Sequence, residues 1–313
     1  MLKGLFVIVP SVLLKSEIDS IQIANNQPPY HRHDLSFSLK LKYTYQRTNF
    51  KIAGKYKPNA SIKMDVELPV DKLMLVPIEQ NASSHSNIKG KIHVVLVSPG
   101  SFNPPTFMHL RLFELARDVL NSKGFNVVGG YMSPVNDAYK KKGLIPSEHR
   151  ITMCQLACKS SDFVMVDAWE AKQTSFQRSL TVLSRIRSFF SDNGLIPNAS
   201  LKVMLVCGSD LLESFGIPGA WIPDQVRSIC RDYGVVCIRR EGQDIEKIIS
   251  HIDILTEYRN NIQVVDEIVP NRISSTLVRD CISRGLSVKY LTSDEVIDYI
   301  KQHQLYTNQQ QNV

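Results

Sequence analysis

Long hydrophobic runs are missing from this sequence. No apolar stretch reaches the roughly 18 residues that a membrane-spanning helix needs, which excludes a transmembrane protein. Hydrophobic residues nevertheless make up 43% of the 313 residues, and charged residues make up 21%. This composition excludes a wholly disordered chain and is typical of a globular protein with a substantial core.

Cysteine pairs of the C-x-x-C type are also missing, and the first 150 residues contain no cysteine. Cys154 and Cys158 are one helical turn apart and could share a metal ion, but no second ligand pair has the spacing of a zinc site. Thiols in a reducing compartment are the better interpretation. The six cysteines are Cys154, Cys158, Cys207, Cys230, Cys237 and Cys281.

Acidic residues are scarce at the N-terminus. Residues 1–63 contain ten basic and three acidic residues, so this segment carries the whole net charge of +7. The remainder is balanced, which argues against nucleic acid as the partner of the globular part. Nucleic-acid binding by the basic segment itself stays open as the weaker alternative.

The folded domain is expected to follow this basic segment. Residues 1–90 read as a poorly ordered extension and linker, with Met64 as an alternative start. Residues 91–306 read as one domain, and residues 307–313 as a polar tail. No small-x-small cleavage site follows the apolar stretch at residues 4–14, so cytoplasm or nucleus is the expected location, with organelle targeting as the alternative.

From residue 91 onward, short apolar runs alternate with amphipathic stretches. The apolar runs predict strands and the amphipathic stretches predict helices, one of them with Ser147 at its N-cap and Glu148 in its first turn. This alternation predicts an α/β fold with a mostly parallel sheet and helices on both faces. The expected strands cover residues 93–98, 125–132, 163–166, 201–207, 234–238 and 262–265, and the expected helices cover residues 106–121, 147–159, 176–190, 275–284 and 293–302.

The first candidate site motif follows the first expected strand. It reads Gly-Ser-Phe-Asn-Pro-x-x-x-x-His-Leu-Arg from Gly100 to Arg111. Thr106 and His109 are three residues apart, so both face one side of the first helical turn. Free amides at the turn and the helix start, next to an imidazole, are donors that suit a phosphate group.

The second motif is another junction between a strand and a helix. It runs from Asn271 to Arg279 and contains Ile-Ser-Ser-Thr. Hydroxyl groups and amides at a helix start, with Arg279 one turn inside, would form a second anion site. An ordinary helix cap is the alternative for this motif taken alone.

Two further segments lie where strands are expected to end. Residues 133–143 include a lysine triplet around Lys141, which could hold a phosphate. Gly208-Ser209-Asp210 follows the fourth strand, and the Asp210 carboxylate could accept from a ribose hydroxyl or position a cation. Trp221 lies in a Pro-Gly-Ala-Trp loop, where a core position is not expected and its face could stack on a flat ring.

Together these motifs closely resemble those of the eukaryotic nicotinamide/nicotinate mononucleotide adenylyltransferases. These enzymes belong to a nucleotidyltransferase superfamily with a His/Thr-x-x-His motif, and the resemblance covers residues 91–306. It implies a Rossmann-like three-layer fold. It also implies transfer of AMP from ATP to a pyridine mononucleotide, with NAD or its nicotinate form and pyrophosphate as products.

The resemblance also implies roles by position. His109, Lys141 and Arg279 would stabilise charge and orient the substrates. The residues expected around ATP are Gly100, Ser101, Phe102, Thr106, His109, Gly208, Asp210, Asn271, Ser275, Thr276 and Arg279. The residues expected around the mononucleotide are Ser101, Lys141, Phe176, Ser179 and Trp221, of which Trp221 would stack on the pyridine ring. Some relatives carry tryptophan at the position of Phe176, and family members often have Gly-Ala-Asp in place of Gly208-Ser209-Asp210.

The implied chemistry needs no protein nucleophile, because the attacking group is the ionised phosphate of the mononucleotide. A divalent cation, Mg²⁺, is expected on the triphosphate, held mainly by phosphates and water rather than by protein ligands. Alternatives that stay open are another small-molecule nucleotidyltransferase of the superfamily and an added chaperone or interaction role. The sequence decides neither the preferred mononucleotide nor the oligomeric state, and a homo-oligomer remains one alternative.

Overall fold

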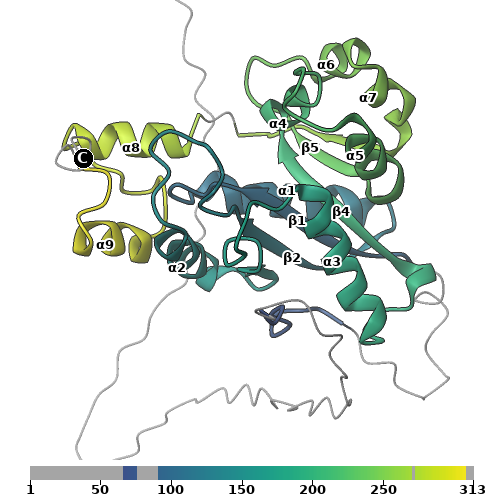
Figure 1. Cartoon of the computed structure of the whole chain (residues 1–313), viewed down its shortest axis with the longest axis horizontal. Coiled ribbons are helices and arrows are strands. Elements are labelled where there is room, and N and C mark those ends of the chain that lie inside the picture. Colours follow the sequence, from purple (N-terminus) through teal and green to yellow (C-terminus); the bar gives the residue numbers. More distant parts are fainter. Residues whose placement is uncertain (1–65, 76–90, 270–271, 308–313) are drawn as a thin grey trace, which may run out of the picture. The chain divides into compact units, whose positions relative to one another are not determined.

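Six parallel strands form the central sheet of the computed structural model (Figure 1), in the order β3-β2-β1-β4-β5-β6. The structure describes residues 66–75, 91–269 and 272–307, which lie within one compact unit, Asn59–Val313. The strand order reverses between β1 and β4, and ligands of parallel sheets bind beyond the carboxyl ends of the strands at such a point. The strands are β1 His93–Gly100, β2 Asn126–Pro134, β3 Val164–Val166, β4 Leu201–Gly208, β5 Val235–Ile238 and β6 Ile262–Val265.

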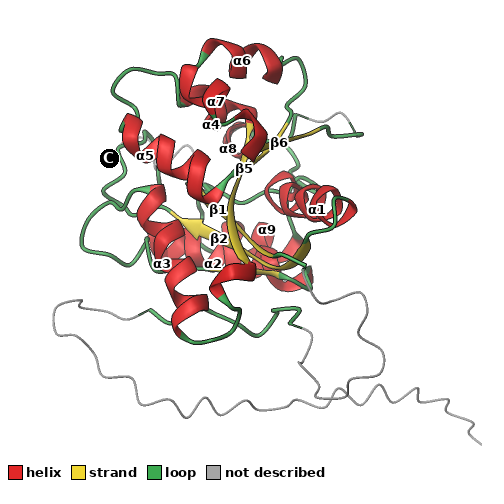
Figure 2. Cartoon of the chain, turned by 90° about the vertical axis from the view of Figure 1, so that its right-hand side faces the viewer, coloured by secondary structure: helices red, strands yellow, loops and turns green. Residues whose placement is uncertain are grey.

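Helices cover both faces of this sheet. Figure 2 shows α1 on one side of the strands and α3 and α5 on the other, as expected for right-handed crossovers in a parallel sheet. The helices are α1 Phe107–Ser122, α2 Ser147–Ala157, α3 Ser179–Asp192, α4 Ser209–Ser214, α5 Pro223–Ser228, α6 Ile245–His251, α7 Asp253–Glu257, α8 Ser275–Ser283 and α9 Asp294–Gln302. The three-layer α/β prediction is therefore confirmed.

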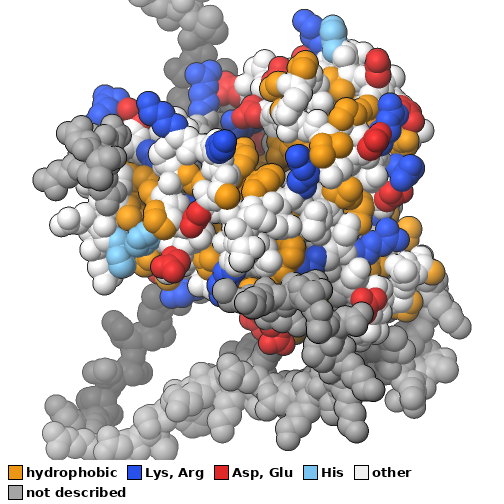
Figure 3. All heavy atoms as spheres, viewed as in Figure 1, with side chains coloured by type: hydrophobic (Ala, Val, Ile, Leu, Met, Phe, Trp, Pro, Cys, Tyr) orange, Lys and Arg blue, Asp and Glu red, His pale blue; other side chains and the backbone are white. Residues whose placement is uncertain are grey.

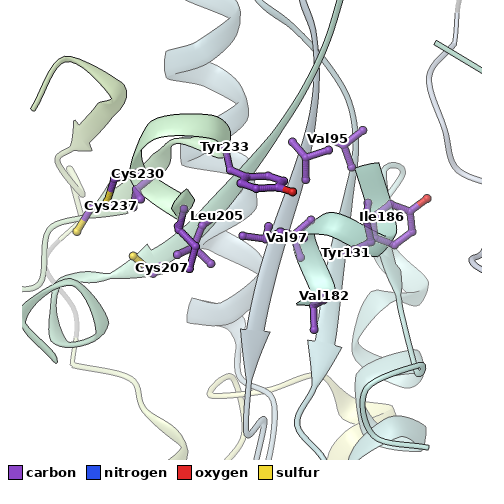
Figure 4. Packing of buried hydrophobic residues seen from close by; sticks show 14 of the residues in the cluster. Val95, Val97, Tyr131, Val182, Ile186, Leu205, Cys207, Cys230, Tyr233 and Cys237 are labelled. Carbon is purple, nitrogen blue, oxygen red and sulfur yellow. The ribbon is translucent and has the colours of Figure 1, made fainter. Parts of the chain in front are cut away.

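The alternation of side chains along β1 divides the core between the two faces. Val95 and Val97 point toward α3, where they pack with Val182 and Ile186 (Figure 4). Val94 and Leu96 point the other way and pack with Phe113 and other residues of α1. Because successive strand residues face opposite sides, a continuous apolar run is what a strand buried on both faces requires.

Two adjacent glycines in β2 let neighbouring segments approach the sheet closely. A Cβ on Gly130 would lie 2.7 Å from Cδ1 of the buried Phe113 ring, and a Cβ on Gly129 would lie 2.6 Å from Cδ2 of Leu73. Leu73 belongs to residues 66–75, which lie in the expected N-terminal extension. Glycine is therefore required here by packing on both faces of the strand.

Residues 66–75 pack against the domain, in contrast to the disorder expected for residues 1–90. Leu68 is buried, the Met74 amide donates to the Val128 carbonyl over 2.8 Å, and the Tyr131 hydroxyl donates to the Pro69 carbonyl over 2.7 Å. Lys72 donates to the Cys158 carbonyl over 2.6 Å. The packed unit therefore includes this segment. The rest of the expected extension, with Met64, the linker at residues 76–90 and residues 308–313 of the tail, lies outside the described residues.

The C-terminal helices add a smaller layer. Val296 and Ile300 of α9 pack against Met153 and Ala157 of α2, and Val278 of α8 packs against Ile297. Beside this contact His149 and His303 lie together, with ring centroids 5.2 Å apart. Figure 3 shows a group of histidine side chains, in pale blue, on the part of the surface where Figure 1 draws α2 and α9.

Each of the expected strands and helices is present, with small shifts at the ends. Ser147 is the first residue of α2 rather than its N-cap, which is Pro146, whereas Glu148 lies in the first turn as expected. Helix α3 begins at Ser179, not at Phe176. The short helices α4 to α7 had no counterpart in the sequence prediction.

Candidate active site

A cleft of about 1020 Å³ opens at the carboxyl ends of β1, β4, β5 and β6. Its lining comes from the two junction motifs, the lysine loop and the ends of β4 and β5. The predicted site residues that line it are Gly100, Ser101, Phe102, His109, Lys141, Gly208, Asp210, Ser275 and Thr276. The cleft therefore unites segments that lie up to 176 positions apart in the sequence.

The turn after β1 is built around the Phe102 ring. Phe102 has φ of 43°, a left-handed conformation, and its side chain is buried. A Cβ on Gly100 would lie 3.1 Å from this ring, which meets the His109 ring edge to face with centroids 5.2 Å apart. A strained backbone at a cleft is typical of a ligand-binding loop.

His109 is held as a neutral donor. Its Nδ1 accepts from the Thr106 amide over 3.0 Å and lies 2.8 Å from the Thr106 hydroxyl, so the ring proton resides on Nε2. Burial, with the positive charges of Arg240 and Lys141, lowers the pKa of His109 to about 4. Because Nδ1 is an acceptor, Nε2–H is the ring donor available to a ligand.

The lysine loop lies beside this turn. Lys141 donates to the Ser101 hydroxyl over 3.0 Å, and the Asn103 amide group donates to the Gly143 carbonyl over 2.7 Å. Partial burial and the nearby Arg279 charge lower the pKa of Lys141. The positive charges of Lys141 and Arg279 repel each other, and this repulsion favours the binding of an anion near them.

The second motif holds the first one in place. Arg279 donates to the Asn103 carbonyl over 2.8 Å, and the Ser275 hydroxyl donates to the Pro104 carbonyl over 2.7 Å. The Ser274 hydroxyl caps α8 by accepting from the Leu277 amide. The helix-cap alternative is therefore confirmed for Ser274. Asn271 lies outside the described residues.

Further residues near the C-terminus hold the same turn. The Thr292 hydroxyl donates to the Pro105 carbonyl over 2.9 Å, and the Tyr306 hydroxyl donates to Oδ1 of the buried Asn103 over 2.8 Å. Three consecutive carbonyls, at positions 103 to 105, are thus bound by side chains from α8 and beyond. The C-terminal segment therefore fixes the path of the chain from β1 into α1.

The wall formed by β4 and β5 carries residues that the sequence analysis missed. Arg240 pairs with the Asp210 carboxylate, to which Gln243 also donates over 3.0 Å. Arg240 also acts electrostatically on His109, so its positive charge lies near that ring. A basic Arg239-Arg240 pair directly after β5 was the signal in the sequence, since ligand-binding groups gather at such strand ends.

The residues expected around the pyridine ring are not among those that line this cleft. Phe176 stacks on Tyr139 of the lysine loop, with centroids 5.6 Å apart. Trp221 is half-buried, packs against the core, and donates from Nε1 to the Ser214 hydroxyl over 3.0 Å. Trp221 is thus no core residue, as expected, but it packs against the core from its loop. Its hydrogen bond and its edge-to-face contact with Phe215 hold the ring.

A buried acidic loop after β3 was also missed. The Asp167 carboxylate is buried and pairs with Arg185 over 3.1 Å, and the Arg185 guanidinium also lies over the Trp169 ring. Burial is the main cause that raises the pKa of Glu170 to about 8. Perturbed carboxyl groups near a cleft often belong to functional sites, although this loop lies outside the lining of the main cleft.

Neither a membrane-spanning helix nor a cluster of metal ligands occurs in the described ranges. None of their helices is long and apolar enough to cross a membrane. Within the same ranges no three side chains of His, Cys, Asp or Glu gather as a metal site. The six cysteines are free thiols, and five of them are buried, as expected for core thiols.

Known proteins share this fold and these segments. The model of the cytidylyltransferase-like family matches residues 97–281. A nicotinamide/nicotinic acid mononucleotide adenylyltransferase of Arabidopsis thaliana is 66% identical over 244 residues, which are 78% of this chain and 99% of the plant protein. The protein of the same description from Oryza sativa subsp. japonica is 62% identical over 245 residues, covering 78% and 95%.

Among solved structures, the Plasmodium falciparum nicotinic acid mononucleotide adenylyltransferase complexed with NaAD superposes with a TM-score of 0.50. The match covers 68% of this chain and 97% of that chain at 18% identity, and it shows a shared fold. Fold and cleft thus define the class: the chain is a nucleotidyltransferase of the cytidylyltransferase-like family. Within that family it belongs to the nicotinamide/nicotinic acid mononucleotide adenylyltransferases.

Proposed function

We propose that this enzyme transfers AMP from ATP to nicotinamide or nicotinate mononucleotide, forming NAD or deamido-NAD and releasing pyrophosphate. The single observation that supports these residue assignments is the neutral state of His109. Its Nε2–H can donate to an anion, and the positive charges of Arg240 and Lys141 act on its ring. Two polyanions must be brought together in this reaction. A site of preformed donors serves this purpose without a protein nucleophile.

In this proposal the triphosphate of ATP occupies the turn after β1. Amides of Ser101 and Phe102 and the Nε2–H of His109 donate to its oxygens. Lys141 and Arg240 neutralise the charge that builds up on the leaving pyrophosphate and the charge that the attacking phosphate brings into the site. An anion at this place raises the pKa of His109, since opposite charge favours the imidazolium form.

The remaining assignments follow the motifs. Gly208, Asp210 and Thr276 lie where the cleft extends past β4 and α8, which supports a role toward the adenosine part. Arg279 and Ser275 act by holding the turn after β1, and Arg279 also contacts the Thr276 hydroxyl over 3.4 Å. Phe176, Ser179 and Trp221 remain our proposed contacts to the mononucleotide. Asn271 and Thr106 complete the proposed ATP set.

A divalent cation, Mg²⁺, belongs to this proposal. The four cleft carboxylates are each paired with an arginine: Asp210 with Arg240, Glu241 with Arg272, Asp266 with Arg239, and Glu267 with Arg111. Because these carboxylates already have partners, the donor set fits a cation held mainly by phosphate oxygens and water. When bound, the cation screens the triphosphate charge against the approaching phosphate.

Location in the cytoplasm or nucleus is likewise our proposal.

The test measures NAD formation from ATP and nicotinamide mononucleotide with Mg²⁺. His109→Ala removes the neutral donor and is expected to lower the rate on the order of 10²-fold or more. His251→Ala, at an exposed position on α6, serves as the matched control and should retain the wild-type rate. A wild-type enzyme that is inactive with both pyridine mononucleotides would contradict the substrate assignment. Equal rates for His109→Ala and wild type would contradict the site.

A further inference from the structure

A fully buried arginine lies behind the turn that carries Ser101 and Phe102. Arg150 is in the first turns of α2, and its side chain has no exposed surface. Its guanidinium donates to the carbonyls of Ser101 over 3.2 Å, Val135 over 2.7 Å and Ile145 over 2.9 Å. It also donates to the Asp137 carboxylate over 2.8 Å. One side chain thus joins the turn after β1 to the start of the lysine loop, residues 133–143, and to Ile145 just beyond its end.

These contacts set the direction of two amide groups in the turn. In a trans peptide the carbonyl and the following N–H point in opposite directions. Arg150 binds the Ser101 carbonyl, so the Phe102 N–H points away from the buried guanidinium. The Val135 amide donates to the Gly100 carbonyl over 2.9 Å, so by the same geometry the Ser101 N–H points away from Val135.

Neither of these amides has a protein partner in the part of the chain that the structure describes. No acceptor in the described ranges receives a hydrogen bond from the Ser101 or Phe102 amide. Phe102 has φ of 43°, and successive N–H groups in such a turn form a concave anion-binding nest. The nest therefore exists only while the carbonyls behind it are held.

We propose that Arg150 is a positioning residue for triphosphate binding: by fixing the Ser101 carbonyl, it aims the Phe102 amide into the cleft and holds Lys141 beside Ser101. This inference rests on the proposed function, in which that turn binds the triphosphate. Arg150 itself touches no substrate, because its side chain is enclosed on all sides.

The chemistry of the guanidinium explains why arginine occupies this place. Four acceptors from three directions need a planar group with several fixed donors, and lysine offers a single nitrogen. A buried charge is tolerated when it is paired and fully hydrogen-bonded, and here the Asp137 carboxylate and three carbonyls meet that condition. Arg150→Lys therefore keeps the positive charge but loses the planar arrangement of donors that reaches all four acceptors.

The experiment compares Arg150→Lys and Arg150→Ala with a control of similar stability. Leu120→Ala removes a buried side chain near the far end of α1, away from the cleft, and should lower Tm without changing KM. We expect Arg150→Lys to lower kcat/KM for ATP on the order of 10²-fold. Binding of inorganic triphosphate, measured by calorimetry, should weaken in the same variant and stay unchanged in Leu120→Ala.

Chemical rescue separates positioning from a merely structural role. Millimolar guanidinium ion should fill the space left in Arg150→Ala and restore part of its kcat/KM, whereas it should not improve Leu120→Ala. Wild-type values of KM and triphosphate affinity in folded Arg150→Lys would overturn the inference.

If neither Arg150 variant folds, Asp137→Asn serves as the alternative. It weakens the interaction of the Arg150 guanidinium with the half-exposed Asp137 side chain and should raise the KM for ATP. An unchanged KM in that variant would also overturn the inference. The triphosphate titration reports on Arg150 even if the enzyme forms no NAD, which separates this inference from the proposed function.

Discussion

At the scale of single residues, protonation decides what His109 does. The Thr106 amide occupies Nδ1, so protonating the ring would break that hydrogen bond while adding charge beside Arg240 and Lys141. A neutral imidazole donates one hydrogen bond through Nε2 and adds no further charge to a site rich in cations. Its strength as a donor therefore stays constant through the physiological pH range.

The low pKa of His109 predicts a specific loss of stability in acid. An unfolded histidine has a pKa near 6.5, and the folded one has a pKa of about 4, so the unfolded state binds more protons between these values. Stability is therefore complete above pH 6.5 and falls as the pH drops toward 4. Between pH 7.5 and 5 we expect a loss of about 1 kcal/mol, below the full linkage value because residue 109 keeps some exposed surface at the cleft.

Urea unfolding of wild type and His109→Asn at the two pH values measures this loss. Asparagine retains an acceptor for the Thr106 amide and does not titrate, so its stability should change less over the same range. An equal change in both proteins would assign the acid sensitivity to other groups.

At the scale of elements, the glycines of β2 determine how closely α1 and residues 66–75 approach the sheet. Gly130→Ala would place a Cβ 2.7 Å from a carbon of the fully buried Phe113 ring. Overpacking of this kind costs about 1–3 kcal/mol, which chemical denaturation would detect. Adding Phe113→Leu should recover part of the loss. A double variant as unstable as the sum of the two single variants would show that the two side chains do not clash.

The C-terminal helices offer a matched pair of hydroxyl deletions. Tyr306→Phe leaves the buried Asn103 oxygen without its donor, whereas Tyr299→Phe removes a hydrogen bond to His149 away from the turn. Both changes should cost about 1–3 kcal/mol or less in the free energy of unfolding. Only Tyr306→Phe should raise the KM for ATP. Steady-state kinetics of both variants tests this, and equal KM values would mean that the turn holds its shape without Tyr306.

At the scale of the whole molecule, the sequence determined the order of elements because each strand is buried on both faces and reads as an apolar run. The two junction motifs were predictable because turn residues and a histidine stand at fixed spacing. Arg150 was not, since its role arises from contacts across distant segments. Arg240 was missed although the basic pair directly after β5 was a signal for it. The short helices α4 to α7 were missed because elements of five to seven residues carry little periodicity.

The contacts that hold the turn after β1 join residues made early to residues made much later, and this order matters during synthesis. The ribosome releases the turn at residues 100–109 early, whereas its donors at positions 275, 279, 292 and 306 emerge 171 to 203 residues later. A nascent chain can assemble most of the sheet, yet the turn stays unsecured until these donors have emerged. Catalytic competence therefore requires residues 275–306, and products truncated before residue 275 are expected to be folded in large part but inactive.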